Sequence, residues 1–219
     1  MRIFVASSNQ QIIKLSKLAQ ASSIRSYQLT NSAGTTVTIL NYGAIISSFK
    51  VKNADGSYND IVLGFDDPKD YLREDYLASY PYFGAAIGRY ANRIGLAGFN
   101  IDGTAYKVSS NSGHNQLHGG FEGFDKKFWT LIHHDEKSVQ LEYVSKEGEE
   151  GFPGELTTTI TFTLSDDDEL KYLYQATTNQ STAINLTHHS YFNLNNGKGR
   201  IDEHKVKIDG DYNLEQQPD

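Results

Sequence analysis

The chain has 219 residues and a formal net charge of −7, so it is acidic and long enough to bury a sizeable core. This charge and a pI near 5.5 argue against nucleic acid and anionic membranes as partners, because both bind basic surfaces. No segment approaches the roughly 20 consecutive apolar residues of a membrane-spanning helix. Cysteine is absent, and the apolar run from Ile3 to Ala6 is too short for a secretory signal, so we expect a cytoplasmic protein.

In chain order, the first predicted element is a short helix. Apolar residues recur at helical spacing between Gln10 and Ala21, and we assign residues 1–24 to an N-terminal extension. Beyond it, three pairs of alternating segments flank short turns and predict antiparallel hairpins: 27–31 with 35–40, 99–101 with 106–108, and 156–164 with 169–178. Short strands at this spacing predict an all-β fold, a large antiparallel β-sandwich that forms one domain over residues 25–219.

The segment from Ile184 to Leu194, INLTHHSYFNL, combines polar and apolar residues in alternation. If it is one strand, one face carries Asn185, Thr187, His189, Tyr191 and Asn193, and the other Leu186, His188, Ser190, Phe192 and Leu194. The first face could exchange hydrogen bonds with a sugar, and the imidazole of His189 could transfer a proton near neutral pH. The more ordinary interpretation of such a row is the solvated side of an amphipathic sheet.

A second polar cluster comes from residues 88–94, GRYANRI, and 111–120, NSGHNQLHGG. Three glycines predict that the latter is a loop whose main chain can approach a ligand closely. Arg93 is either a structural ion-pair partner or a fixed donor to ligand oxygens, and the sequence does not decide between them.

Two pairs of histidines raise the question of a metal site. His114 and His118 have the spacing of a helical zinc site, but the surrounding glycine and asparagine disfavour a helix, and no HExxH motif is present. His188 and His189 are adjacent on the expected strand and would point to opposite faces. We therefore expect no metal and no other cofactor.

Six stretches of the chain carry a family resemblance: NYGAIISSFKV (41–51), DIVLGFDD (60–67), YFGAAIGRYANRI (82–94), NQLHGGFEGFDKKFW (115–129), EEGFPGEL (149–156) and INLTHHSYFNL (184–194). GRYANRI, LHGG and HSYFNL in that order form a specific signature. From about Tyr27 to its last residue, the chain resembles the aldose 1-epimerase (galactose mutarotase) family. The resemblance implies a galactose mutarotase-like sandwich that interconverts the α and β anomers of free aldoses such as galactose and glucose.

The resemblance also implies roles for individual residues. Asn92 and Arg93 would contact sugar hydroxyls. His118 would bind near the ring oxygen and the anomeric centre and would support catalysis.

The HSYFNL motif would supply the general acid. His189 would protonate the ring oxygen, and Ser190 and Tyr191 would belong to the substrate-binding set. Many family members have asparagine where this chain has His188, which we expect to face away and to matter little.

Opening an aldose ring also needs a base that removes the proton of the anomeric hydroxyl. Family members end in a further portion with a sugar-binding aspartate and the glutamate base, and this chain stops at Asp219 before a matching motif. Glu155, Glu169 and Glu203 have the sequence context of solvated carboxylates.

We therefore expect this chain to be incomplete at its C-terminus and weak in catalysis. Its strand edges, and apolar residues such as Leu156, Ile160 and Phe162, should then be partly unshielded.

The alternative is a non-catalytic sugar-binding module that has lost its general base. A glycoside hydrolase would need two carboxylates flanking a bond, and the motifs contain no such pair. The expected partner is a free monosaccharide, and the expected assembly is a monomer or homodimer.

Overall fold

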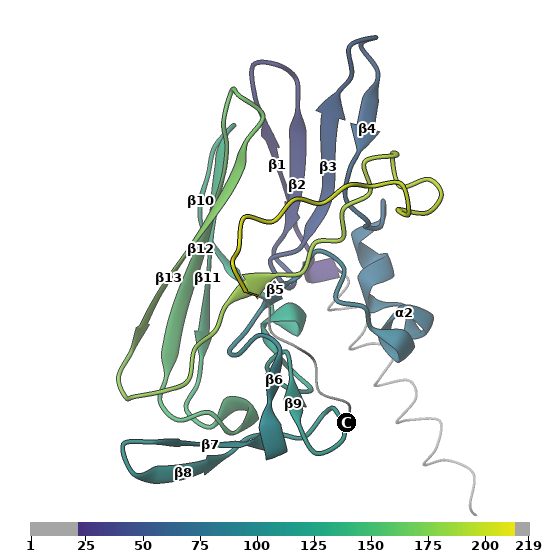
Figure 1. The fold of residues 1–219 in the computed structure, drawn as a ribbon. Helices are drawn as coiled ribbons and strands as arrows, with labels where there is room; N and C mark the ends of the chain where they lie inside the picture. The colour runs from purple at the N-terminus through teal and green to yellow at the C-terminus, as the bar shows by residue number, and fades with distance from the viewer. Residues whose placement is uncertain (1–21, 213–219) are drawn as a thin grey trace, which may run out of the picture.

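The computed structural model describes residues 22–212 and has an all-β, antiparallel architecture (Figure 1). Its main body is a pair of four-stranded sheets, with strand orders β1-β2-β3-β4 and β10-β11-β12-β13. The first sheet comprises β1 (Ser26–Thr30), β2 (Thr36–Leu40), β3 (Ile46–Lys52) and β4 (Tyr58–Asp60). The second comprises β10 (Thr130–His134), β11 (Ser138–Ser145), β12 (Leu156–Leu164) and β13 (Leu170–Thr178).

All three hairpins predicted from the sequence are confirmed. β1 pairs with β2, and β12 pairs with β13 from Leu156 opposite Thr178 to Leu164 opposite Leu170. The third hairpin joins β7 (Gly98–Ile101) to β8 (Thr104–Lys107). Its two turn residues, Asp102 and Gly103, both have positive φ, as a tight two-residue hairpin turn requires.

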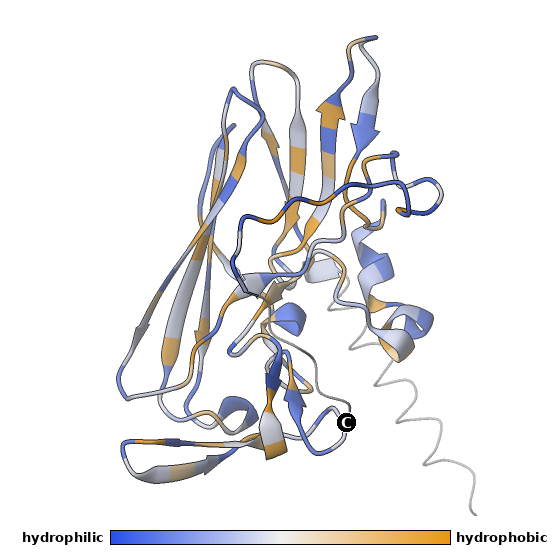
Figure 2. Ribbon diagram, viewed as in Figure 1, coloured by the Kyte–Doolittle hydropathy of each residue, from blue (hydrophilic) through white to orange (hydrophobic). Residues whose placement is uncertain are grey.

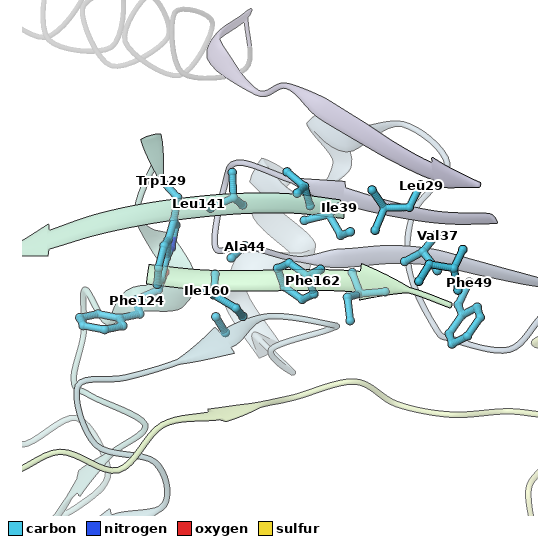
Figure 3. Close-up of a cluster of buried hydrophobic side chains, with 14 of the residues drawn as sticks. Leu29, Val37, Ile39, Ala44, Phe49, Phe124, Trp129, Leu141, Ile160 and Phe162 are labelled. Carbon is cyan, nitrogen blue, oxygen red and sulfur yellow. The ribbon is translucent and has the colours of Figure 1, made fainter. Parts of the chain in front are cut away.

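The core lies between the two sheets, where alternation along strands such as β2, β11 and β12 brings one face of the strand inward. Figure 2 shows this alternation of apolar and polar residues along β3. Figure 3 shows side chains of the two sheets meeting in one cluster, among them Leu29, Val37, Ile39, Leu141, Ile160 and Phe162. The expectation that Leu156, Ile160 and Phe162 are partly unshielded was wrong, because the first sheet covers this face and all three are fully buried.

Short elements beside the sandwich carry the polar motifs of the sequence. β5 (Ala86–Ile87) pairs with β14 (Thr187–His188), and β6 (Arg93–Ile94) pairs with β9 (Gln116–Leu117). The helical turns are η1 (Pro68–Leu72), α2 (Glu74–Ser79), η2 (Gly95–Ala97), η3 (Phe124–Lys126) and η4 (Glu149–Gly151). GRYANRI, LHGG and HSYFNL therefore meet through two-residue strand pairs and loops.

The prediction of one long strand over residues 184–194 was wrong. Only Thr187–His188 forms a strand, because this segment pairs in turn with different neighbours. Asn185 bridges to Tyr90 and Phe192 bridges to Val62 on either side of β14. Phe192 and Leu194, expected on an apolar packing face, are 54% and 58% exposed.

Two further expectations concern an N-terminal helix and a membrane-spanning helix. The predicted helix over Gln10 to Ala21 lies outside the described residues. Within residues 22–212, no helix is long and apolar enough to cross a membrane.

Candidate active site

The two arginines of GRYANRI have different environments. Arg89 is 2% exposed, and its guanidinium donates to the carbonyl oxygens of Ser145, Lys146, Pro153 and Gly154 at 2.9–3.2 Å. Arg89 is therefore a structural link between this motif and the loops at the end of the second sheet. Arg93 is exposed, and its strongest described contact is a 3.5 Å hydrogen bond to the Asn92 side chain.

The described residues supply no acidic partner for Arg93. Within residues 22–212, no carboxylate lies within ion-pairing distance of its guanidinium, so the ion-pair interpretation has no partner there. An exposed guanidinium without a carboxylate keeps its donors available for ligand oxygens.

Main-chain pairing places His118 next to Asn92. Arg93 pairs with Leu117 across β6 and β9, and the amide of His118 donates to the carbonyl of Asn92 at 3.0 Å. The loop then packs on the GRYANRI motif at Gly119, where a Cβ would lie only 1.9 Å from the carbonyl oxygen of Gly88. Glycine at this position therefore permits the contact between the two motifs.

The imidazole of His118 has a defined tautomer. The main-chain amide of Asn92 donates to its Nδ1 at 3.0 Å, so Nδ1 is an acceptor and the proton of the neutral ring sits on Nε2. Burial, followed by the charges of His189 and Arg93, lowers the pKa of His118 to about 4. Near pH 7, His118 is thus a neutral group that offers an Nε2–H donor.

His189 reaches the same place from the third motif. Its amide donates to the carbonyl of Ala85 at 2.8 Å, and its carbonyl accepts from the amide of Gly84 at 3.1 Å. Its ring lies edge-to-face against His118, with ring centres 5.2 Å apart, and contacts Tyr191 at 5.1 Å. Neither ring nitrogen of His189 has a hydrogen-bond partner within the described part of the chain, so both are available to a ligand.

Tyr82 completes the cluster and was missed in the sequence analysis. Its ring centre lies 4.9 Å from that of His118 and 5.5 Å from that of His189. Burial, with a smaller effect of the Asp125 charge, raises the pKa of Tyr82 to about 12, so the phenol stays neutral. The residue opens the YFGAAIGRYANRI stretch, but nothing in the alternation pattern distinguished it from a core aromatic.

Three of the ten described residues other than glycine that have positive φ lie at this cluster. Tyr82, Asn92 and His118 all have φ between 51° and 62°, a region that costs free energy for residues other than glycine. Such strain persists where the surrounding structure fixes it, and it is common at ligand sites. Here the strained residues are His118 itself and two residues that contact its ring, Tyr82 and Asn92.

Several other candidates from the sequence lie elsewhere. Asn185 donates to the carbonyl of Ala91 at 3.1 Å, and Asn193 is buried with its amide near the carbonyl of Gly199. Ser190 lies on the opposite side from His189, where its hydroxyl contacts Nδ1 of His188 at 3.0 Å. His188 faces away from the cluster, as expected. The structure thus joins Asn92, Arg93, His118, His189 and Tyr191, and it separates Ser190 from them.

Three glutamates near these motifs or predicted to be solvated make contacts away from the imidazoles. Glu155 and Glu169 form exposed ion pairs with Lys146 and Lys171. Glu150 accepts from the amides of Phe121 and Glu122 at 3.2 and 2.8 Å and so fixes the turn after LHGG.

Asp125 is an exception because it is fully buried. Among the described residues, neither of its carboxyl oxygens has a hydrogen-bond partner, and Lys126 Nζ lies 3.7 Å from Oδ2. Burial raises the pKa of Asp125 to about 6, against the opposing charge of Lys126.

No group of three or more histidine, aspartate or glutamate side chains within residues 22–212 is arranged to hold a metal ion. The cluster itself offers two imidazoles, a guanidinium, an amide and phenols. These groups donate and accept hydrogen bonds and can move one proton, which suits a neutral polyhydroxylated ligand.

Known proteins resemble this chain over most of its length. The sequence model of the family Aldose 1-epimerase matches residues 25–219. The chain is 43% identical over 194 residues to a galactose mutarotase of Sus scrofa, and the match spans 87% of this chain and 54% of that protein. It is 38% identical over 186 residues to an aldose 1-epimerase of Escherichia coli, spanning 85% of this chain and 52% of the relative.

A solved structure of a GalM/aldose epimerase homologue from C. elegans superposes with a TM-score of 0.72 at 30% identity. That likeness covers 78% of this chain and 51% of the other chain. The chain therefore spans about half the length of the relatives it matches. With the family model matching nearly all of it, the chain belongs to the aldose 1-epimerase family.

Proposed function

We propose that the protein interconverts the α and β anomers of free aldoses such as galactose and glucose, by acid and base catalysis of ring opening and reclosure. The observation that carries the proposal is the edge-to-face pair of His118 and His189 beside the guanidinium of Arg93. Within residues 22–212, the outward nitrogens of the two imidazoles have no hydrogen-bond partner and Arg93 has no carboxylate partner. The names of the relatives support the same activity.

In this proposal His189 donates a proton to the ring oxygen as the bond from that oxygen to the anomeric carbon breaks. A base removes the proton of the anomeric hydroxyl, and the electron pair of that O–H bond forms the carbonyl of the open-chain aldehyde. Rotation of the carbonyl and the reverse proton transfers then close the ring with the other anomeric configuration. Each positioned proton-transfer group contributes roughly a hundred- to ten-thousandfold in rate.

The remaining groups of the cluster hold the sugar during these steps. His118 offers its Nε2–H to a sugar oxygen, since its other nitrogen is occupied by the Asn92 amide. Arg93 and Asn92 donate to hydroxyls, and Tyr82 and Tyr191 form the walls that keep the two imidazoles in place.

The general base is the part of the proposal that these groups do not supply. Within residues 22–212, no aspartate or glutamate makes a contact with His118, His189 or Arg93, so the proposal places the base outside this range. The absence of such a carboxylate also favours a second candidate function, a sugar-binding module without catalysis.

Polarimetry separates the two functions. Freshly dissolved α-galactose should change its optical rotation faster with the protein than in buffer alone. His189→Ala should lower the protein-dependent rate at least about a hundredfold, whereas His133→Ala on the exposed strand β10 should not. If sugar binds but the rotation changes only at the rate of buffer, the binding module is the better description.

A further inference from the structure

The side of HSYFNL that faces away from the sugar cluster contains an imidazole with two hydrogen-bond partners. His188 Nε2 lies 3.3 Å from the carbonyl oxygen of Ala44, and its Nδ1 lies 3.0 Å from the hydroxyl of Ser190. A carbonyl can only accept, so Nε2 carries the proton, and Nδ1 must then accept from the Ser190 hydroxyl. Both partners therefore select one tautomer of a neutral ring.

The surroundings of His188 keep the ring in this neutral form. It packs against Phe162 and Tyr172, with ring centres 5.8 and 5.4 Å away. Burial is the largest of the effects that lower the pKa of His188 to about 4. Near pH 7 the ring therefore keeps both its donor and its acceptor.

The two hydrogen-bond partners of His188 come from different parts of the chain, the Ala44 carbonyl from the first sheet and the Ser190 hydroxyl from the residue after His189. Ala44 is fully buried in the turn between β2 and β3, and the neighbouring Gly43 carbonyl accepts from the amide of Ala86 at 2.9 Å. Ser190 follows His189 directly. His188 thus connects a rigid point of the first sheet to the residues immediately before and after His189.

Packing alone does not fix this segment. A cavity of about 120 Å³ borders His188 and Ser190 and is lined mainly by apolar side chains. The lining residues are Ile46, Phe49, Val62, Leu170, Tyr172, His188, Ser190 and Phe192. Main-chain hydrogen bonds to Ala85 and Gly84 hold the backbone of His189. Because there is free volume beside the segment, the two hydrogen bonds of His188 add more to this hold than they would in a close-packed core.

We propose that His188 is a positioning residue for His189: its imidazole holds residues 188–190 to the Ala44 carbonyl and so aims the His189 ring at the sugar. This proposal rests on the proposed function for the role of His189. It replaces the sequence-based expectation that His188 matters little.

Three substitutions separate the hydrogen bonds from the packing. His188→Phe keeps an aromatic ring but loses both bonds, and Ser190→Ala loses one bond and leaves the ring. His188→Gln can restore the donor to Ala44. The matched control is His134→Phe, since His134 Nε2 also lies 3.2 Å from a carbonyl oxygen, that of Gln28, but on the exposed strand β10.

The first readout is the side-chain NMR spectrum of His189 in the sugar-free protein, including its contacts with Tyr82. His188→Phe should shift the His189 signals and weaken the Tyr82 contact, Ser190→Ala should do so less, and His188→Gln should recover part of the wild-type spectrum. His134→Phe should leave both unchanged.

The second readout is affinity for galactose. Loss of the two bonds should weaken binding at least about fivefold, a change that corresponds to about 1 kcal/mol.

The proposal is overturned if His188→Phe leaves the His189 spectrum as unchanged as His134→Phe does. If His188→Phe does not fold, Ser190→Ala decides in the same way, because it retains the ring. A protein that binds no sugar, yet shows the expected spectral changes, would reject the proposed function and leave the role of His188 supported.

Discussion

The sandwich and the sugar cluster place their residues by different means. Between the sheets, apolar side chains such as Ile160 and Phe162 are buried by strand alternation, and continuous ladders of up to nine residue pairs set their register. Around His118 and His189, the strands are two residues long and three nearby residues have positive φ. Stability is therefore concentrated in one region, and the strained polar geometry of the other depends on single side chains.

The largest effect that tests this contrast is a loss of core volume. Phe162→Ala should lower the free energy of unfolding by about 3–5 kcal/mol, because the ring is fully buried between the sheets. Phe192→Ala, in the exposed segment after β14, should cost less than about 1 kcal/mol. Urea unfolding of both variants measures the difference, and equal losses would mean that the segment after β14 belongs to the core.

The two arginines of GRYANRI give the next test. Arg89→Met should lower the free energy of unfolding by at least about 3 kcal/mol, because three buried carbonyls and one partly buried carbonyl lose a charged donor. Arg93→Met should change stability little and abolish most sugar affinity. The same unfolding experiment, with a galactose titration, compares them. Loss of stability in Arg93→Met with unchanged galactose affinity would mean that Arg93 is structural and does not bind the sugar.

The sequence predicts the sandwich well because alternation is a local signal. The hairpins at 27–40, 98–107 and 156–178 need only a strand period and a turn, and all of them form. The segment 184–194 failed as a single strand because its pairing partners, near Ala86, Tyr90 and Val62, are set by the tertiary fold and not by its own pattern.

The candidate site was predicted in part for the same reason. His118, His189 and Arg93 stand in motifs that the family resemblance identifies. Tyr82 has no such local signal, since its role comes from a positive φ and from contacts with residues about 36 and 107 positions away. Ser190 was assigned to the sugar side by its motif alone, whereas the contact with His188 turns it to the other side.

Substitution of Asp125 should have a smaller effect on the free energy of unfolding, and it should raise this free energy. Its folded-state pKa of about 6 lies above the ordinary value of 3.8, so the stability it contributes is fully present below about pH 4 and is lost as the pH rises through about 6. Asp125→Asn should therefore stabilise the protein at pH 7, on the order of 1–3 kcal/mol, and by much less at pH 4. Thermal unfolding at both pH values measures this, and destabilisation at pH 7 would show that the carboxylate has a partner.

The half-buried imidazoles of His118 and His188 should have the opposite pH dependence and lower stability in acid. His118 and His188 have pKa values near 4, below the ordinary 6.5, so the unfolded chain takes up their protons first as the pH falls. Their contribution to stability is present above about pH 6.5 and is lost as the pH falls toward 4. Replacing His188 with Gln should flatten the stability profile in this window. An unchanged slope would mean that His188 is already charged in the folded protein.

The most direct test of the account is a galactose titration followed by the imidazole nitrogen signals of the histidines. If the cluster is the sugar site, the Nε2–H signal of His118 and the signals of His189 should move together and saturate at one concentration. Those of His133 and His134 on the exposed strand β10 should stay unchanged. The result holds whether or not the bound sugar is turned over. No change at His118 and His189, or equal changes at all four histidines, would contradict the claim that these two imidazoles form a site for a free aldose.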